Sequence, residues 1–573
     1  LDILSLLFST LHVSAMDHKR TRPDGSDQQH EAPTTKQAKC DSSVSPDDSH
    51  VITLQLLCTN DTHSQMEPFT HASHRHALGG VARRAVVFAK MRGEAHATLT
   101  LDVGDLFTGQ PFFEFFQGEA EMTILAALGY NATAVGNHDF DGKCVATGDL
   151  GIPHFKKVAA KYAPNVELLC ANVVDERTGE LLFRPHAVFE PFSGGNDPFS
   201  GIKVGVAAVL GEQAFDVITS SLRKGLRYTD YLEAARVSAG KLREAGCDVL
   251  VCLSHTGVDR GDRALTALGL YDVVFSGHSH FFDKFDTFDK IKGPGGRLGL
   301  LSPGFAKGGG ICWARLEVDR IAHRIVDHSS GVVLLEEGCD ENLAIGALVK
   351  EWRLQFLEGL GLNERIGRCA ENLSLPDKHT DQASTFSEIH SALHRALRQE
   401  FLFLLLEGGS LPEALHKAEV GSDVLVITNR YSAAHGLKVG DMTRGALCEL
   451  IVYNGDMLLV QLSGRLLAAL VERNAFFAGQ PDFLVMTGVE YMIQARGGGP
   501  LPAVPLATEE VKAGALECTA ATVAGAALDV QHGMYWCIID DYCLDTLAAG
   551  LAERVDGVRW QSPTKIGYRD LVE

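Results

Sequence analysis

The sequence predicts an α/β protein built from two units joined by a helix. From residue 51 onward, short apolar runs alternate with stretches in which apolar residues recur three and four positions apart. After residue 319 this pattern changes, and a long amphipathic stretch follows. The 573 residues exceed what one compact core holds, because domains average about 150 residues. We therefore expect a layered α/β domain, a connecting helix and a smaller α/β domain.

The first unit is expected at residues 50–335. Its strand candidates are mostly continuous apolar runs, as in sheets that are covered on both faces. They lie at residues 51–58, 98–103, 132–135, 168–171, 203–209, 249–253 and 273–275. Helices are expected between them at residues 81–91, 119–128 and 231–245.

The linker is expected at residues 336–375 and the second unit at residues 376–573. One helix over 342–359 would carry Leu343, Leu348, Trp352 and Phe356 along a single face. In the second unit, helices are predicted around residues 384–407 and 466–474, and strands at residues 423–428, 450–452, 457–462 and 535–540.

The N-terminal segment, residues 1–49, is expected to be disordered. Residues 17–49 are rich in Asp, Ser, Gln, Lys and Pro, and such a composition cannot offset the entropy lost on ordering. The apolar residues before them lack a basic leader, so a signal remnant and an upstream extension stay open as alternatives. The incomplete signal pattern slightly favours the cytoplasm.

Charge and composition exclude several classes of partner. Fifty-two Lys and Arg residues against 73 Asp and Glu residues give a net charge of −21. This surplus repels phosphate backbones and anionic lipids, so no nucleic-acid partner is expected. No run of 18 apolar residues occurs, so no transmembrane segment is expected. The 13 cysteines are too few for a disulfide scaffold, and most should be buried thiols. The oligomeric state stays open.

Polar side chains follow five of the strand candidates in the first unit. In an open α/β sheet, ligands bind beyond the carboxyl ends of the strands, so these side chains should converge. The residues are Asp61 and His63, then Asp105, then Asn137, His138 and Asp141, then His255, and finally His278 and His280. Oxygen and nitrogen ligands without cysteine suit Zn²⁺, Mn²⁺, Fe or Co. The set is too large for one ion and fits two, with Asp105 best placed to bridge them.

These motifs, in this order, resemble a known signature. Asp61-x-His63, Gly104-Asp105, Gly136-Asn137-His138-Asp139, His255 and Gly277-His278-x-His280 resemble the calcineurin-like metallophosphoesterases. Asn60-Asp61-Thr62-His63, Gly136-Asn137-His138-Asp139-Phe140-Asp141 and the helix-linked second unit resemble, more narrowly, the 5′-nucleotidase family. The resemblance implies a four-layer α/β sandwich, a linker helix and a smaller 5′-nucleotidase-type C-terminal domain.

The resemblance also implies a chemistry and a set of site residues. Asp61, His63, Asp105 and His280 would hold one divalent ion, and Asp105, Asn137, His255 and His278 the other. His138, oriented by Asp141, would be the general acid while a metal-bridging hydroxide attacks a phosphate ester. Two neighbouring residues have other expected roles: Asp139 as a partner of a ligand rather than a ligand, and Phe140 as packing.

The second unit departs from the family pattern. The Asn-Gly-Gly-x-x-Arg turn of the family is replaced by residues 428–434, in which Asn429 remains and the glycines and arginine are absent. Tyr453 is the candidate for the first base-stacking aromatic, and residues 546–551 contain no Asp and no aromatic ring. We therefore expect a small phosphorylated substrate, with nucleotides among the candidates. A phosphodiesterase or pyrophosphatase acting on a non-nucleoside substrate and a metal-bound, non-catalytic scaffold stay open as alternatives.

Overall fold

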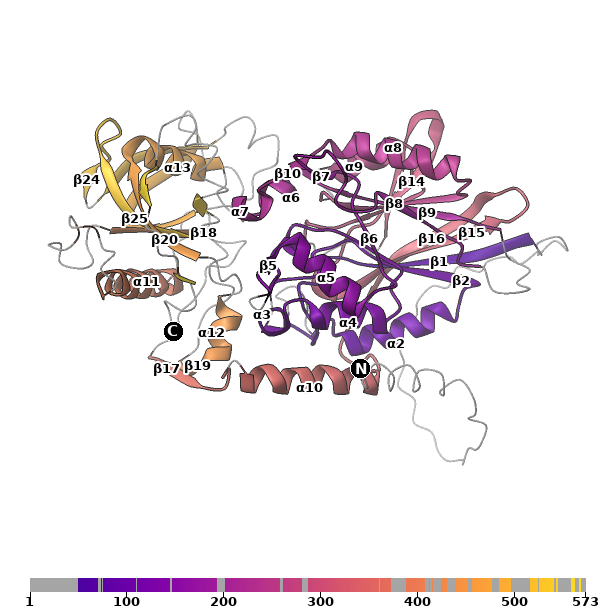
Figure 1. Ribbon diagram of the computed structural model, residues 1–573, viewed down its shortest axis with the longest axis horizontal. Coiled ribbons are helices and arrows are strands. Elements are labelled where there is room, and N and C mark those ends of the chain that lie inside the picture. Colours follow the sequence, from indigo (N-terminus) through magenta and orange to yellow (C-terminus); the bar gives the residue numbers. More distant parts are fainter. Residues whose placement is uncertain are drawn as a thin grey trace, which may run out of the picture.

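The structure is a computed structural model that describes residues 50–573 with gaps. The longer gaps are residues 193–200, 281–286, 373–387, most of 408–423, 430–438, 452–455, 477–483, 496–515, 545–557 and 568–573. The N-terminal segment 1–49 lies outside the described residues. Figure 1 shows two lobes connected along one side by helix α10 (Leu343–Gly359).

The first lobe contains two six-stranded sheets. One has the order β16-β15-β1-β2-β3-β6 and the other the order β13-β14-β12-β11-β9-β8. The strands of the first sheet are β1 (Val51–Thr59), β2 (Ala97–Asp102), β3 (Ala132–Ala134), β6 (Glu167–Leu169), β15 (Gly310–Asp319) and β16 (Arg324–Leu334). Those of the second are β8 (His186–Phe189), β9 (Val204–Leu210), β11 (Val249–His255), β12 (Val273–Ser276), β13 (Asp289–Lys292) and β14 (Leu298–Leu301). Within each sheet four strands run parallel, β1-β2-β3-β6 and β14-β12-β11-β9, so their carboxyl ends lie at one edge.

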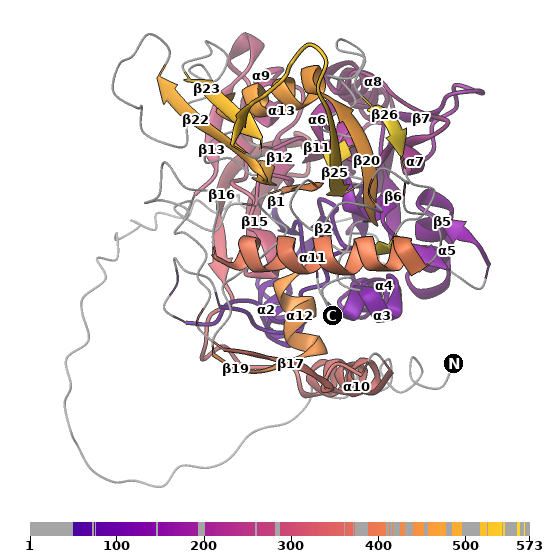
Figure 2. The same cartoon turned by 90° about the vertical axis from the view of Figure 1, so that its left-hand side faces the viewer.

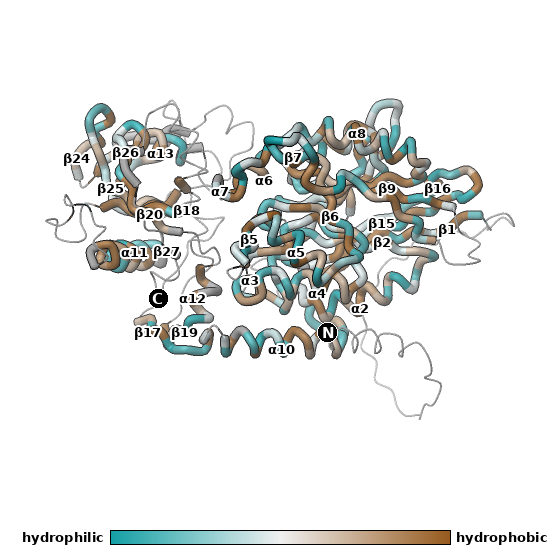
Figure 3. Tube along the Cα trace, in the orientation of Figure 1, coloured by the Kyte–Doolittle hydropathy of each residue, from teal (hydrophilic) through white to brown (hydrophobic). Residues whose placement is uncertain are grey.

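Alternation of side chains along the strands builds four layers. Ile52, Leu54 and Leu56 of β1 pack between the two sheets with residues of β9 and β11, whereas Leu57 packs with the outer helices. Helices α2 (Val81–Arg92), α4 (Glu119–Ala127) and α5 (Ile152–Tyr162) cover the first sheet, and α8 (Tyr231–Glu244) and α9 (Arg263–Ala267) cover the second. Hydrophobic segments accordingly follow inner strands such as β9 (Figure 3).

Helix α10 packs against the first lobe through part of the predicted face, which includes Leu348 and Trp352 but not Leu343. Ile345, Leu348 and Val349 are buried, and the Trp352 ring lies 5.8 Å from that of Phe116 in α3 (Pro111–Phe116). Leu343, predicted on this face, is 88% exposed. Position 343 begins the helix directly after the capping residue Asn342, whose Oδ1 accepts the amides of Ala344 and Ile345.

The second lobe contains one mixed sheet with a helix on each face. The order is β21-β18-β25-β20-β26, with strands β18 (Val424–Asn429), β20 (Asp456–Ser463), β21 (Leu484–Thr487), β25 (Met534–Asp540) and β26 (Val558–Gln561). Helix α11 (Glu388–Glu407) covers one face and α13 (Gly464–Phe476) the other, as Figures 1 and 2 show. A smaller sheet of β22 (Val489–Ala495), β23 (Leu516–Val523) and β24 (Ala526–Ala527) lies beside α13.

The strand predicted at residues 450–452 is wrong. Leu450 ends helix α12 (Arg444–Leu450), Ile451 belongs to no strand, and Val452 lies outside the described residues. Thr443 caps this helix by accepting the amide of Ala446, and Leu447 and Leu450, three positions apart, bury on one face. A short apolar run does not distinguish a strand from a buried helix end.

The other predicted strands and helices are present, with ends shifted by a few residues. Cys58, Cys170 and Cys252 are buried free thiols, as expected. Among the described residues, no helix has the length and apolar character needed to span a membrane. The domain limits at residues 50, 336 and 376 stay a proposal.

Candidate metal centre

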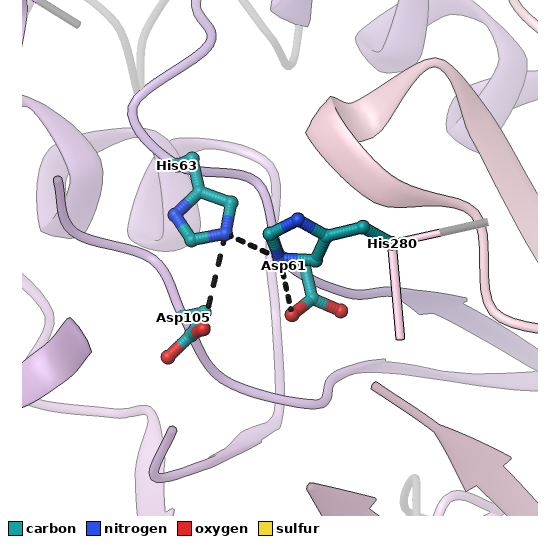
Figure 4. A group of neighbouring side chains, drawn as sticks. All are labelled: Asp61, His63, Asp105 and His280. Atoms are coloured by element: carbon teal, nitrogen blue, oxygen red, sulfur yellow. Dashed lines mark hydrogen bonds and ion pairs between the residues drawn. The ribbon is translucent and has the colours of Figure 1, made fainter. Parts of the chain in front are cut away.

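Five strand ends bring two groups of ligand-type side chains together at one edge of the sandwich. The first, here the Asp61 group, contains Asp61, His63, Asp105 and His280, whose ligand atoms lie within 4.8 Å of one another (Figure 4). The second, here the His255 group, contains Asp105, His255 and His278, within the same distance. Asn137 lies beside it, with Oδ1 3.2 Å from Nε2 of His255. The structure thus places the other six predicted ligands around Asp105.

The backbone at this edge is locally strained. Asp61, His63, Asp105, His278 and His280 all have φ between 46° and 71°, a left-handed conformation uncommon outside glycine. Each such residue costs about 1–3 kcal/mol, and these residues tend to occur at functional sites. The turns hold each other, since the Asp61 amide donates to the Gly104 carbonyl at 3.0 Å and the His63 amide to that of Asp105 at 3.0 Å.

Two glycines allow the turns after β2 and β3 to touch. A Cβ on Gly104, whose φ is +89°, would lie 2.5 Å from the Gly136 nitrogen. A Cβ on Gly136 would lie 2.2 Å from Oδ1 of Asp105. A side chain at Gly136 would therefore displace Asp105, and one at Gly104 would push the two turns apart, so both positions require glycine.

Asp105 is the residue shared by both groups. Its Oδ1 accepts the His138 amide at 2.8 Å. Its Oδ2 is buried without a hydrogen bond from any described residue, and faces Nε2 of His255 at 3.3 Å and Nε2 of His63 at 3.8 Å. Burial alone would raise the pKa of Asp105, but His255 and His138 hold it well below its usual range. A buried, unpaired carboxylate oxygen between imidazoles from both groups fits a shared position between two cations.

Backbone carbonyls fix the tautomers of two histidines. Nδ1 of His63 lies 3.2 Å from the Phe107 carbonyl, and Nδ1 of His255 lies 2.8 Å from the Val103 carbonyl. A carbonyl only accepts, so each Nδ1 carries a proton and each Nε2 faces the centre. Burial opposes a charged His255, but the carboxylates of Asp105 and Asp61 outweigh it and raise the pKa of His255 to about 10. Burial and the nearby His280 lower the pKa of His63 to about 3, which keeps the ring neutral. Nε2 of His63 and Nε2 of His280 lie 2.8 Å apart, so a proton or cation must offset the repulsion between their lone pairs.

His138 is in the opposite charge state. Its Nδ1 lies 2.7 Å from Oδ2 of Asp141, and the Thr108 hydroxyl donates to the same oxygen at 2.7 Å. Burial opposes the charged ring, but the carboxylates of Asp141 and Asp105 outweigh it and raise the pKa of His138 to about 9. The His138 and His63 rings lie only 5.3 Å apart. The two neighbouring rings therefore differ in charge state at neutral pH, and the contact with Asp141 sets His138 apart from the ligand histidines.

Three further residues hold the ligands in place. Asp139 accepts the amides of Asp105, Leu106 and Gly136 at 3.1, 2.9 and 2.8 Å, which ties the two glycine turns together. Asn60 donates to Oδ2 of Asp61 at 2.6 Å. Oε1 of Gln213 lies 2.9 Å from Nε2 of His278. Asp139 was expected in such a position, and Phe140 is fully buried packing, as expected. Asn60 was expected only as part of the Asn60-Asp61-Thr62-His63 motif, and Gln213 was missed, although it lies shortly beyond the carboxyl end of β9.

Comparison with known proteins agrees with this geometry. Residues 54–282 match the family model of the calcineurin-like phosphoesterases. The snake venom 5′-nucleotidase of Gloydius brevicauda is 30% identical over 237 residues, 40% of this chain and 37% of that enzyme. The 5′-nucleotidase of Bos taurus is 23% identical over 471 residues, 76% of this chain and 74% of that enzyme. The 5′-nucleotidase precursor structure from Thermus thermophilus superposes with a TM-score of 0.68 at 21% identity, over 91% of this chain and 96% of that chain.

The chain is similar to the 5′-nucleotidase family within the calcineurin-like metallophosphoesterases over both of its lobes. The fold is the metallophosphoesterase α/β sandwich followed by a smaller α/β C-terminal domain, as in 5′-nucleotidase structures. The match spans only about 37% of the length of the venom relative, so the activity and substrate of this chain are proposals.

The predicted substrate residues in the C-terminal domain of this metallophosphoesterase are untested. Asn429 is the last residue of β18, and the position of its side chain is not described. Tyr453 lies outside the described residues, as do residues 546–551.

Proposed function

We propose that this metallophosphoesterase hydrolyses a small phosphate ester with two divalent ions and one histidine acid. The observation that carries the proposal is the buried, unpaired Oδ2 of Asp105 between the two histidine groups, with the His138–Asp141 pair beside it. The two ligand groups and the proton donor His138 thus all contact the carboxylate of Asp105.

Asp61, His63, Asp105 and His280 would hold one ion, and Asp105, Asn137, His255 and His278 the other. Zn²⁺, Mn²⁺, Fe and Co fit these oxygen and nitrogen donors. Bound there, a pair of ions supplies an activated water and positive charge opposite the phosphoryl oxygens. The left-handed turns and the hydrogen bonds of Asn60 and Asp139 position these ligands before any ion binds.

His138 acts as the proton donor to the leaving oxygen. Asp141 accepts from Nδ1 and raises the pKa of the ring, so Nε2 keeps its proton at neutral pH and can transfer it. The His138 amide also donates to Asp105, which fixes the distance between the acid and the ligand cluster. General acid catalysis of this kind contributes about 10²–10⁴-fold to the rate.

Nucleoside monophosphates are the first substrate candidates. The relatives in Gloydius brevicauda and Bos taurus are 5′-nucleotidases, and Asn429 and Tyr453 are the residues here that could contact a nucleoside. A phosphodiester or pyrophosphate of a non-nucleoside compound is the second candidate. The missing arginine and glycines at residues 428–434 and the missing aromatic ring at residues 546–551 favour it.

A substrate panel separates these candidates. Mn²⁺-loaded protein is assayed for phosphate release from AMP, UMP and p-nitrophenyl phosphate, and for AMP or UMP formation from cyclic AMP and UDP-glucose, with Asp61→Asn as the blank. Preference for a nucleoside monophosphate, weakened by Tyr453→Ala, supports the nucleotidase. Turnover of p-nitrophenyl phosphate without nucleotide preference supports the second candidate. Two bound ions with no turnover on any compound would contradict hydrolysis and favour a metal-bound scaffold.

A further inference from the structure

Gln213 is the nearest described side chain that contacts a proposed ligand from outside the sequence motifs. It lies in the short helix α6 (Glu212–Asp216), directly after β9. Its Oε1 is 2.9 Å from Nε2 of His278, a contact between residues 65 positions apart.

The place of Gln213 is fixed by its surroundings. Strand β9 pairs in parallel with β11, and the amide of Gly211 donates to the carbonyl of His255 at 2.9 Å. A Cβ on Gly211 would lie 2.8 Å from Cα of Thr256, so the two strand ends are in direct contact. After Gln213, Ala214 and Phe215 are 1% and 7% exposed and pack into the core. Packing on both sides of Gln213 therefore fixes helix α6 beside the His255 group.

The chemistry of the contact sets the tautomer of His278. The amide oxygen of Gln213 only accepts, so Nε2 of His278 carries the proton and Nδ1 carries the lone pair. A metal-binding histidine commonly donates its other N–H to such a partner, which fixes the ring and raises its basicity. For His63 and His255 the partner is a backbone carbonyl, which no substitution removes. For His278 it is a side chain.

We propose that Gln213 is a positioning residue for the ion held by the His255 group: it accepts the Nε2 proton of His278 and so directs Nδ1 to the ion. The inference rests on the two-ion site of the proposed function, and it concerns binding of the ion rather than turnover. It predicts that one of the two ions depends on an oxygen acceptor at position 213, whereas the other does not.

The test is a Mn²⁺ titration of chelator-stripped protein, followed by calorimetry and by electron paramagnetic resonance. Three variants are compared with the wild type. Gln213→Leu removes the acceptor, Gln213→Glu keeps it, and Glu212→Ala alters an exposed neighbour on the same helix. The thermal unfolding midpoint of each stripped protein reports whether the fold is intact.

We expect Gln213→Leu to weaken binding of one Mn²⁺ by about 10–100-fold and to leave the other unchanged. The signal of a coupled Mn²⁺ pair should then give way to that of an isolated ion at stoichiometric metal. Gln213→Glu and Glu212→Ala should keep both ions and the coupled signal.

Three outcomes would overturn the inference. They are wild-type affinity for both ions in Gln213→Leu, equal weakening in Gln213→Leu and Gln213→Glu, and fewer than two ions in the wild type. If the wild type releases no phosphate while its second ion depends on Gln213, the proposed function fails and the inference stands.

Discussion

The Asp61 group and the His255 group are positioned by different means. All four members of the Asp61 group have left-handed backbone, and hydrogen bonds between turns hold the chain at these positions. In the His255 group, His255 is part of the extended strand β11, and His278, although its backbone is left-handed too, has Nε2 in contact with the side chain of Gln213. The first group should therefore tolerate changes around it, whereas the second should respond to a single neighbouring side chain.

Removing one ligand from each group should give the largest effects. His63→Ala and His255→Ala each delete an Nε2 that faces Asp105, so each should cost one of two bound ions. Loss of several kcal/mol of charge stabilisation corresponds to a fall of about 10³-fold or more in kcat/KM. Metal analysis and kinetics on both variants check this. If either variant kept two ions and wild-type activity, its group would not be a metal site.

Changing the acid should separate chemistry from metal binding. His138→Asn should lower kcat by about 10²–10⁴-fold with both ions retained, because His138 contacts Asp105 through its backbone amide, which the substitution keeps, and its ring is not a proposed ligand. The loss should be smaller for substrates such as p-nitrophenyl phosphate, whose leaving group needs little protonation. If the variant lost an ion together with activity, His138 would be a metal ligand rather than only a proton donor.

Most residues of this centre can be predicted from the sequence, because each ligand lies at the end of a predicted strand or shortly after it. Asp61, Asp105, His255 and His278 each follow or end a strand, and the parallel order brings these ends together. Gln213 also lies just beyond the carboxyl end of a strand, but nothing in the sequence pairs it with His278, which is 65 residues away. The exposed Leu343 and the helical Leu450 were mispredicted because apolar spacing does not show where a helix begins or which neighbours cover it.

Removing the carboxylate of Asp141, which contacts the ring of His138, should have an intermediate effect on kcat. Asp141→Asn removes a carboxylate that raises the pKa of His138, so that pKa falls. The acid must be protonated, hence the loss of kcat at alkaline pH should begin at a lower pH than in the wild type. The Thr108→Val variant, which removes only the hydroxyl donor to Asp141, should give a smaller shift. Matching pH profiles for Asp141→Asn and the wild type would contradict the assignment of His138.

The smallest effect is expected on stability. Asp139→Asn replaces an acceptor of three buried amides with a side chain that also carries an N–H donor. Leaving one or more of these amides unpaired should lower the free energy of unfolding by about 1–3 kcal/mol. Denaturant unfolding of metal-free protein measures this difference. No change in stability would mean that the two glycine turns hold each other without Asp139.

The most direct test of the account is Asp105→Asn, with bound metal and phosphate release measured on the same preparation. Asp105 is the residue that the two groups share, and its buried Oδ2 faces Nε2 of His255 and of His63 without a hydrogen bond from any described residue. We predict that the variant loses at least one of two ions and about 10³-fold or more of its activity toward p-nitrophenyl phosphate. Two ions and unchanged phosphate release in the folded variant would contradict a shared carboxylate at the centre of this metallophosphoesterase.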